Sequence, residues 1–354
     1  MSPSLASARR SVASVAEFEA LLHSLPGPDE AARAAASERE PCLIKPRGSM
    51  GVLEPLVATL AAWQHRHPPK VETVFVDVFI GAHGIAEYGV SAYPPEVTAQ
   101  MAASYEMEGA AINQLARSCG ARLRVTPIEL DTPTRPFHRE PAMSPEEFVR
   151  ALNVGLSVDL EGADLLCIGE TGIGNTTCAA ALALALFGGE ATDWTGPGSG
   201  VRGEALANKA RLVSEAVALH RPSMASGLDI LRCLGGRELA AMAGATVAAR
   251  LAGVPVVLDG FTTCAAVACL QAVEPGALDH CVLGHLSREP GHGALAAAMG
   301  FEPLLRLGMA LGEATGAVMA VPLLRAACFC HANMATFEEA GVSGEVEGAP
   351  APKA

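Results

Sequence analysis

Short apolar runs alternate along this chain with longer segments in which apolar residues recur at helical spacing. The runs at 71–80, 121–130, 163–168, 254–260 and 280–284 are rich in aliphatic residues and are bounded by turn residues, which is typical of buried strands. Because helical segments separate these runs, we expect a parallel sheet with helices on both faces. The predicted fold class is therefore α/β.

Helices are expected at both chain ends as well as between the strands. Ser144 lies three residues before Glu147, and this capping box marks the start of one helix. Pro94 and Pro95 suit the first turn of another helix. The predicted helices are 15–25, 29–38, 51–63, 94–117, a segment from 144, 178–186, 204–220, 235–253 and 302–340, the last interrupted at 308–316.

A Gly-rich stretch at 169–177 follows the predicted strand 163–168 and precedes a helix. Its glycines let the backbone approach a ligand, and Asn175, Thr176 or Thr177 could cap the helix, whose first N–H groups would face an anion. Glu170 lies at the mouth of the same loop, so the stretch indicates a phosphate site beside a carboxylate. The alternative is an ordinary tight turn, because the stretch is neither a Walker loop nor a complete dinucleotide motif.

Further polar residues follow other predicted strands. Ligands of open α/β sheets bind beyond the carboxyl ends of the strands. We therefore expect Glu170, Asp259, Ser287 and Glu313 to converge at that edge.

Composition narrows the class of function. A formal net charge of −13 argues against nucleic acid or an anionic membrane surface as a partner. No uninterrupted apolar run is long enough to span a bilayer, and residues 1–10 lack the apolar core of a signal peptide. We expect a cytoplasmic enzyme with a frayed tail at 341–354.

The chain has ten cysteines and no Cys-x-x-Cys pair. Most lie in apolar runs, which predicts buried free thiols in a reduced compartment. The segment 328–331, Cys-Phe-Cys-His, is the one cluster that invites a metal, but on a helix only Cys328 and His331 would share a face. Without a second pair of ligands nearby, no metal site is predicted.

Short motifs in a specific order and at specific spacing are distributed over nearly the whole chain. They are Lys45-Pro46-Arg47-Gly48-Ser49, His83-Gly84, Gly89-Val90-Ser91 with Glu96-Val97-Thr98-Ala99, the stretch 169–177, Asn208-Lys209, Leu258-Asp259-Gly260-Phe261, Leu311-Gly312-Glu313 with Thr315-Gly316, and 333–341. Together they resemble the nicotinate-nucleotide–dimethylbenzimidazole phosphoribosyltransferase family of cobalamin (vitamin B12) lower-ligand synthesis.

The resemblance implies a Rossmann-like parallel sheet, in a large α/β domain of 67–316. It also implies a small helical domain built from 1–66 and 317–354, and a homodimer. The implied reaction moves ribose 5-phosphate from nicotinate mononucleotide to a base such as 5,6-dimethylbenzimidazole. No pyrophosphate leaves in this reaction, so no Mg²⁺ or other cofactor is expected.

The resemblance also implies roles for individual residues. Glu313 would be the general base that deprotonates the attacking benzimidazole, and Glu170 the second carboxylate of the site. The residues implied to bind the nucleotide and its phosphate are Gly172, Asn175, Thr176, Lys209, Asp259, Ser287 and Gly312. The segment 91–101 would help to line the base pocket, through Ser91, Tyr93 and Met101.

Taken singly, several of these residues have a plainer interpretation. Glu313 could be a carboxylate that interacts favourably with the dipole at a helix N-terminus. Lys209 could be a solvated surface charge, and Asp259 could cap the helix that follows it. His83 and His285 are interpreted as loop histidines without a catalytic role.

The resemblance leaves the acceptor and the catalytic status open. Many relatives have Asp where Ala82 stands, Pro where Cys178 stands, and Gln where Pro95 stands. Because the change at Pro95 falls in the segment 91–101, adenine, another benzimidazole or a phenol could be the acceptor. A non-catalytic nucleotide-binding subunit is an alternative, although retention of Glu170, Lys209 and Glu313 argues against it. The other alternative is a nucleosidase, which hydrolyses the same bond with water.

Overall fold

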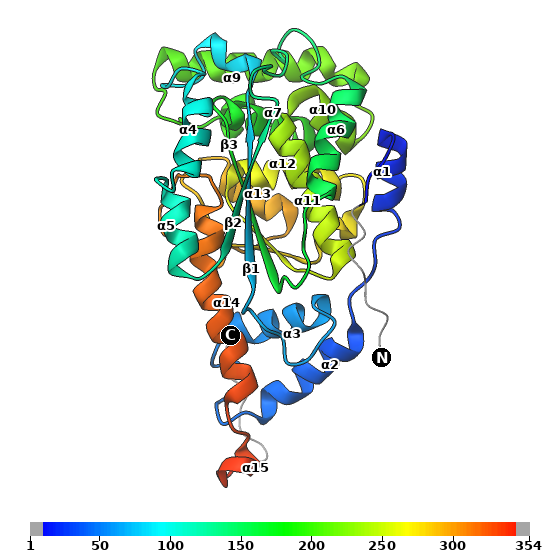
Figure 1. Cartoon of the computed structure of the whole chain (residues 1–354), viewed down its shortest axis with the longest axis vertical. Helices are drawn as coiled ribbons and strands as arrows, with labels where there is room; N and C mark the ends of the chain where they lie inside the picture. Colours follow the sequence, from blue (N-terminus) through cyan, green and yellow to red (C-terminus); the bar gives the residue numbers. More distant parts are fainter. Residues whose placement is uncertain (1–9, 345–354) are drawn as a thin grey trace.

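A single parallel sheet of five strands forms the centre of the molecule in the computed structural model, which describes residues 10–344 (Figure 1). The strand order is β2-β1-β3-β4-β5. The strands are β1 (Val74–Gly81), β2 (Arg122–Ile128), β3 (Leu165–Thr171), β4 (Val256–Leu258) and β5 (Cys281–Leu283). From β1, the chain first adds β2 on one side of the sheet and then adds β3 on the other side. Doubly wound sheets bind ligands at the point where the strand order reverses in this way. The predicted α/β fold is confirmed.

Successive residues of the strands point to opposite faces and so enter two separate apolar clusters. In β1, Phe75 and Phe79 join the first cluster, whereas Val74, Val76 and Val78 join the second. The first cluster also contains residues of α6 (Pro145–Leu156), α7 (Asn175–Phe187), α11 (Arg237–Ala252) and α12 (Phe261–Gln271); the second contains residues of α3 (Leu53–Trp63), α4 (Val97–Glu106), α5 (Ala111–Ser118) and α14 (Thr315–Asn333). Both faces are covered, as predicted.

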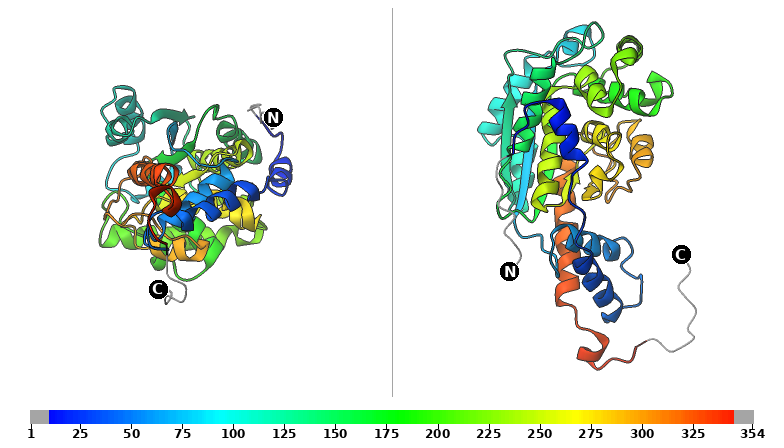
Figure 2. Two further views of the ribbon diagram at one scale, coloured as in Figure 1. Left: turned by 90° about the horizontal axis from the view of Figure 1, so that it is seen from below. Right: turned by 90° about the vertical axis from the view of Figure 1, so that its right-hand side faces the viewer.

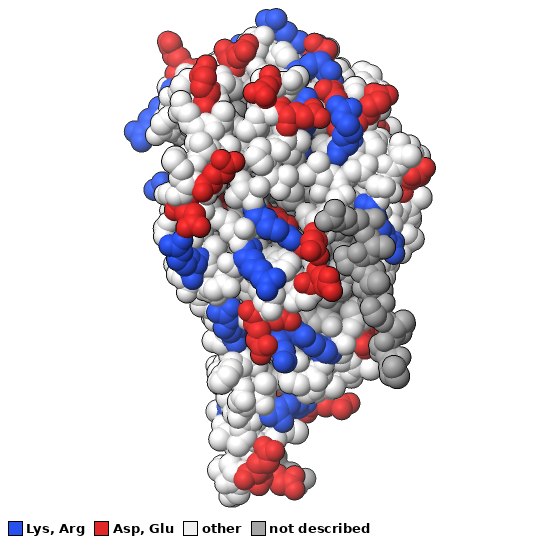
Figure 3. Space-filling model, in the orientation of Figure 1, with Lys and Arg blue, Asp and Glu red and all other residues white. Residues whose placement is uncertain are grey.

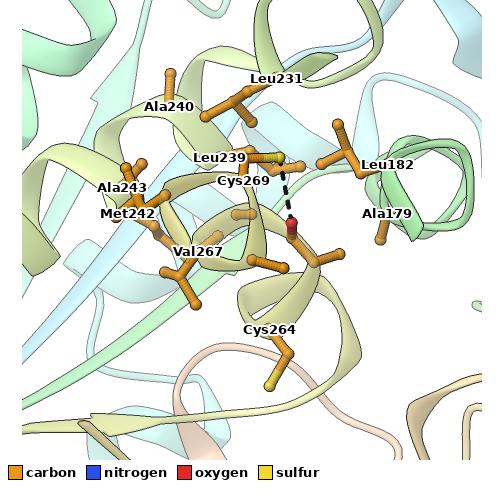
Figure 4. Close-up of a cluster of buried hydrophobic side chains, with 14 of the residues drawn as sticks. Ala179, Leu182, Leu231, Leu239, Ala240, Met242, Ala243, Cys264, Val267 and Cys269 are labelled. Carbon is orange, nitrogen blue, oxygen red and sulfur yellow. Dashed lines mark hydrogen bonds between the residues drawn. The ribbon is translucent and has the colours of Figure 1, made fainter. Parts of the chain in front are cut away.

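Small residues let the helices of the first face pack closely. Figure 4 shows Leu182 of α7, Leu239 of α11 and Cys269 of α12 in this cluster, with the Cys269 thiol donating to its own helix. The cysteines are free, and all but Cys42 and Cys330 are buried.

The backbones of α6 and α11 lie so close together that a side chain would not fit between them at two glycines. A Cβ atom on Gly155 would lie 1.9 Å from the carbonyl oxygen of Ala241, and one on Gly244 would lie 2.2 Å from that of Leu152. Glycine is therefore required on both helices, which fits the predicted small-residue helix at 235–253.

Helices from both chain ends gather beyond one end of the sheet (Figure 2). There, α2 (Glu30–Arg39) is joined to the end of α14, because the Arg39 guanidinium donates to the carbonyl oxygens of His331 and Met334, each at 3.0 Å. By contrast, α1 (Val15–Leu22) lies on the α/β body, where Val12 N–H donates to Asn153 Oδ1 at 2.8 Å.

The division into domains of 1–66 with 317–354 and of 67–316 stays a proposal. Residues 1–9 and 345–354 lie outside the described residues, and most of the predicted frayed tail lies with them.

Two predicted helices were wrong in their bounds. The helix expected at 94–117 is divided into α4 and α5, because Glu108 takes a left-handed conformation (φ 56°) beside Gly109. The helix expected to start at 302 starts only with α14, because Leu304 N–H donates instead to the carbonyl oxygen of Leu283, at 2.9 Å.

The remaining elements include three helices that the apolar pattern did not predict. These are α8 (Ala191–Trp194), α10 (Gly227–Leu234) and α13 (His292–Met299). The others are α9 (Glu204–His220), α15 (Phe337–Ala340) and the short 3-10 helices Glu40–Cys42, Gly84–Tyr88, Arg221–Ser223 and Pro275–Leu278.

Surface charge and the apolar helix α14 are the remaining features of the fold. On the face seen in Figure 3, basic and acidic side chains are interspersed. Among the described residues, α14 is the one helix with the length and composition to cross a membrane, and 56% of its apolar window is buried inside the protein. A buried core helix passes the same test, so this is weak evidence for a span.

Candidate active site

A cavity beyond the carboxyl ends of β3 and β4 brings most of the predicted site residues together. Its lining comes from six separate parts of the chain. The lining residues are Val90, Ser91, 170–176, Gly198, Ser199, 259–262, Ser287, Glu289 and 310–313. Of the predicted site residues, Lys209, Tyr93 and Met101 are not in this lining.

The Gly-rich stretch is shorter as a loop than predicted, because β3 continues through Glu170. The loop proper is 172–174. It ends at Gly174, whose left-handed backbone (φ 101°) precedes the first residue of α7. The prediction that Asn175, Thr176 or Thr177 caps this helix was wrong, since the helix begins one residue earlier and its cap position has no side chain.

Glu170 and Glu313 share the cavity and are joined through the backbone. The N–H of Glu313 donates to the carbonyl oxygen of Glu170 at 3.0 Å. Glu313 and Ala314 both have left-handed backbones, with φ of 67° and 63°. Each such non-glycine residue costs on the order of 1–3 kcal/mol and is usually held by its surroundings at functional sites.

The surroundings of the Glu313–Ala314 turn leave no room for a larger residue. A Cβ atom on Gly169 would lie 2.0 Å from Ala314 N, and one on Gly312 would lie 2.8 Å from Glu170 Oε1. The glycines therefore let the two carboxyl groups approach the cavity from adjoining segments.

Burial raises the pKa of Glu170 to about 8, helped by the negative charges of Glu238 and Asp259. The Asn175 side-chain amide donates to Glu170 Oε2 and acts in the opposite direction. The raised pKa favours the protonated form of Glu170 at neutral pH.

Burial also raises the pKa of Glu313, opposed by donors from the Tyr105 hydroxyl and the Ile112 N–H. Its Oε2 atom is buried and accepts no hydrogen bond from the described residues. A buried carboxylate oxygen without a donor is available for a proton of a ligand.

Asp259 follows β4 and lines the cavity. The suggestion that it caps the next helix in the chain was wrong, because Gly260 occupies that position without a side-chain bond. Asp259 Oδ1 accepts instead from Ala317 N–H of α14 at 2.9 Å. Burial raises the pKa of Asp259 to about 7, although the backbone N–H groups of Ala314, Gly316 and Ala317 act to lower it. Its position therefore holds the start of α14, and with it the segment that carries Glu313.

Lys209 of α9 is fully buried beside the loop, so its interpretation as a solvated charge was wrong. Its Nζ atom donates to Thr176 Oγ1 at 2.8 Å and to the carbonyl oxygen of Gly196 at 3.0 Å. Burial lowers its pKa to about 8. The ammonium reaches the cavity through Thr176, which is part of the lining.

Ser287 lines the cavity and is paired with a residue that the sequence did not single out. His292 Nδ1 accepts from Ser287 N–H at 2.9 Å and lies 2.9 Å from Ser287 Oγ. Burial lowers the pKa of His292 to about 4, so the ring is neutral and its Nδ1 atom is an acceptor. The sequence contained a signal for His292 and Glu289, because both follow the predicted strand 280–284, as Ser287 does.

Comparison with known proteins agrees with this geometry. A family profile described as phosphoribosyltransferase (DBI_PRT) matches residues 25–342. The chain is 54% identical over 329 residues to the nicotinate-nucleotide–dimethylbenzimidazole phosphoribosyltransferase of Ruegeria pomeroyi, covering 93% of this chain and 97% of that one. The chain belongs to this family.

Other relatives give the same picture. The protein of the same name from Brucella canis is 51% identical over 327 residues, covering 92% of this chain and 96% of that one. The crystal structure of the protein of that name from Thermus thermophilus has a TM-score of 0.83 at 41% identity, covering 89% of this chain and 99% of that one. The Rossmann-like fold and the family resemblance are confirmed.

Of the predicted base-pocket residues, Ser91 alone lines the cavity. Its hydroxyl lies 2.8 Å from that of Ser199, which also lines the cavity. Tyr93 is 55% exposed, and Met101 packs half-buried against the second apolar cluster. The roles of these residues in base binding stay predictions.

A buried ion pair lies behind the Gly-rich loop. His83 Nε2 and Glu238 Oε1 are 2.5 Å apart, and both side chains are fully buried. His83 also lies beneath Gly172, where a Cβ atom would be 3.0 Å from its Nε2 atom. Sequence reasoning missed Glu238, although a lone acid in a helix of small apolar residues is a signal for a buried charge.

Metal ligands do not gather anywhere in the described range: among residues 10–344, no group of three or more His, Cys, Asp or Glu side chains could hold a metal ion. His331, from the 328–331 segment, has its Nδ1 atom 2.5 Å from a Glu40 oxygen.

Proposed function

We propose that this protein transfers ribose 5-phosphate from nicotinate mononucleotide to 5,6-dimethylbenzimidazole or a related base in cobalamin lower-ligand synthesis. The products are α-ribazole 5′-phosphate and nicotinate, and the enzyme is a pentosyltransferase. The observation that supports this most strongly is that Glu170 and Glu313 face one cavity beside a Gly-rich loop and a buried lysine.

The phosphate of the nucleotide would lie at the loop end of the cavity. Gly172, Asn175 and Thr176 line this end, and Lys209 donates to Thr176 from below. Backbone N–H groups near a helix start and a buried ammonium both favour a phosphate dianion. Ser287 and Gly312 line the ribose side of the same cavity in this proposal.

Departure of nicotinate needs no general acid. The pyridinium ring of the nucleotide already carries a positive charge, so the leaving group departs as a neutral ring. The ribose carbon becomes oxocarbenium-like, and a nearby carboxylate stabilises that charge. Glu170 fits this role, because a bound cation favours its ionised form and so lowers a pKa that burial has raised.

The incoming benzimidazole becomes cationic as its nitrogen bonds to the ribose carbon. Glu313 takes the N–H proton in this proposal, because its Oε2 atom has no donor and its raised pKa makes it a stronger base. A positioned general base contributes roughly a hundred- to ten-thousand-fold in rate. Inversion at the ribose carbon requires the two heterocycles to lie on opposite faces of the sugar.

The setting of the enzyme is part of the proposal. We propose a cytoplasmic homodimer that acts on small molecules and needs no cofactor, since no pyrophosphate leaves. Its formal net charge of −13 disfavours nucleic acid and anionic membranes as partners.

The acceptor base is the least constrained part. The segment 91–101 carries Ser91, and its differences from many relatives leave adenine, another benzimidazole or a phenol open as acceptors. A competition assay among these bases, with mass analysis of the ribotide formed, identifies the preferred acceptor.

Nicotinate release from nicotinate mononucleotide, followed with and without added base, tests the reaction type. We expect release only when a base is present. Release that does not depend on a base would indicate a nucleosidase, and nucleotide binding without release across all bases would indicate a non-catalytic subunit.

A further inference from the structure

The buried ammonium of Lys209 makes no direct ion pair with a carboxylate of the described residues. Its two acceptors, Thr176 Oγ1 and the Gly196 carbonyl, are neutral. Among the described residues, no carboxylate oxygen comes within 4.0 Å of its Nζ atom, the limit for an ion pair. A buried positive charge is unfavourable unless negative charge lies near it, so this position favours an anionic group. The acid whose charge acts on Lys209 is Glu289.

Glu289 lies at the phosphate end of the cavity. Its Oε1 atom accepts from Gly198 N–H at 3.0 Å, while its Oε2 atom is buried without a donor from the described residues. A Cβ atom on Gly198 would lie 2.6 Å from Thr176 Oγ1 and 3.1 Å from Lys209 Nζ. The Glu289 carboxylate therefore sits against the same short segment as the two groups expected to bind phosphate.

A second donor at this end is also satisfied from within the protein. The N–H of Thr176, in the first turn of α7, donates to Asn175 Oδ1 at 2.7 Å. Together with the bond from Gly198 to Glu289, this means that side-chain oxygens occupy two amides that a phosphate would use. These side-chain oxygens thus take positions that a phosphate oxygen would take in the proposed complex.

We propose that the Glu289 carboxylate occupies the phosphate site of the empty enzyme and that a phosphorylated ligand binds by displacing it from the Gly198 N–H. This rests on the proposed function, which assigns that end of the cavity to the nucleotide phosphate. Glu289 is then a specificity-determining residue. It weakens binding of free phosphate, whereas a nucleotide gains enough from its ribose and base to displace it.

The other charged groups around Glu289 do not duplicate this role. Lys209 faces it from α9, and neutral His292 lies on α13. Glu170, Asp259 and Glu313 belong to the same cavity lining, at the ends of β3, β4 and the segment before α14. Of these groups, Lys209 is the one whose charge acts on the Glu289 carboxyl.

Titration of inorganic phosphate into the intact protein by calorimetry at pH 7 tests the displacement. Glu289→Gln keeps an acceptor for Gly198 but removes the charge, and Glu289→Ala removes both. We expect both variants to bind phosphate roughly tenfold or more tightly than the parent, because like charges in contact oppose binding strongly. Glu302→Gln, at a side chain that is 90% exposed, is the matched control and should leave the affinity unchanged.

Unchanged or weaker phosphate binding by Glu289→Gln would overturn the proposal. A measurement on the parent protein covers the case in which the variants fail to fold. A crystal structure with phosphate bound should show the Gly198 N–H on a phosphate oxygen, and persistence of its bond to Glu289 would contradict displacement.

Kinetics separate this proposal from the proposed function. With nicotinate mononucleotide, Glu289→Gln should lower KM without raising kcat. Absence of turnover by the parent protein with every base would remove the proposed reaction, while the phosphate titration would still decide the role of Glu289.

Discussion

At the scale of the residue, burial gives the charged groups of one cavity different tasks. Burial raises the pKa of Glu170 to about 8 and that of Asp259 to about 7, and it lowers that of Lys209 to about 8. Shifted pKa values of this kind are common at catalytic sites. Asp259 bonds to α14, Lys209 bonds to Thr176 of α7, and one oxygen of Glu313 accepts no hydrogen bond from the described residues.

Replacement of Lys209 by Met should weaken nucleotide binding. The change removes a charged donor beside the phosphate, and such hydrogen bonds contribute about 1.5–3 kcal/mol. We expect the KM for nicotinate mononucleotide to rise roughly ten- to a hundredfold. Lys70→Met, at a side chain that is 51% exposed, is the control. Equal effects of the two changes on KM would contradict a role in phosphate binding.

Nucleotide affinity should depend on the protonation of Lys209. Because burial lowers its pKa to about 8, the ammonium is present below that pH and is lost above it. The KM for the nucleotide is therefore expected to rise as pH increases through 8. Steady-state kinetics from pH 6.5 to pH 9.5, at about half-unit steps, measure this limb. The limb should be missing in Lys209→Met, and its survival there would assign it to another group.

At the scale of the element, close backbone approaches position the cavity. The β3 strand touches the segment before α14 at Gly169, and α6 touches α11 at Gly155. The apolar pattern predicted every strand, because buried parallel strands are short apolar runs between turns. It could not predict that α5 is separate from α4, which depends on the backbone conformation at Glu108. Nor could it predict that 302–307 is irregular, because this depends on the bond from Leu304 N–H to the Leu283 carbonyl oxygen.

Gly155→Ala should destabilise the fold markedly. The new Cβ atom would lie 1.9 Å from the Ala241 carbonyl oxygen, so α6 has to move away from α11. Overpacking of this kind typically costs about 1–3 kcal/mol, and the melting temperature should fall. Gly293→Ala, in α13 with nothing within 4 Å of the new atom, is the matched control. It should change stability by less than about 1 kcal/mol, and equal losses in both variants would contradict the packing argument.

At the scale of the whole molecule, the sheet brings distant segments to one edge. The sequence placed Glu170, Asp259, Ser287 and Glu313 together, because parallel strands end at the same edge of the sheet. It missed Glu289 and His292, because the strand-end argument does not tell which of several polar residues in one loop enter the cavity. It also missed Glu238, which lies in the apolar helix α11 and pairs with His83.

The product should have the α configuration at the ribose carbon. The attacking base and the departing nicotinate would occupy opposite faces of a sugar held at its phosphate, so attack inverts the β-linked nucleotide. Nuclear magnetic resonance of the isolated ribotide determines the anomer. A β product would indicate two successive displacements, and with them a covalent intermediate that one free carboxylate oxygen does not explain.

The proposed reaction depends most on Glu313 as the base that deprotonates the acceptor. Turnover of Glu313→Gln at saturating nucleotide and base, measured together with nucleotide affinity, tests this directly. We predict that kcat falls roughly a hundred- to ten-thousand-fold while nucleotide affinity stays within about twofold. Turnover equal to that of the parent protein would contradict the account.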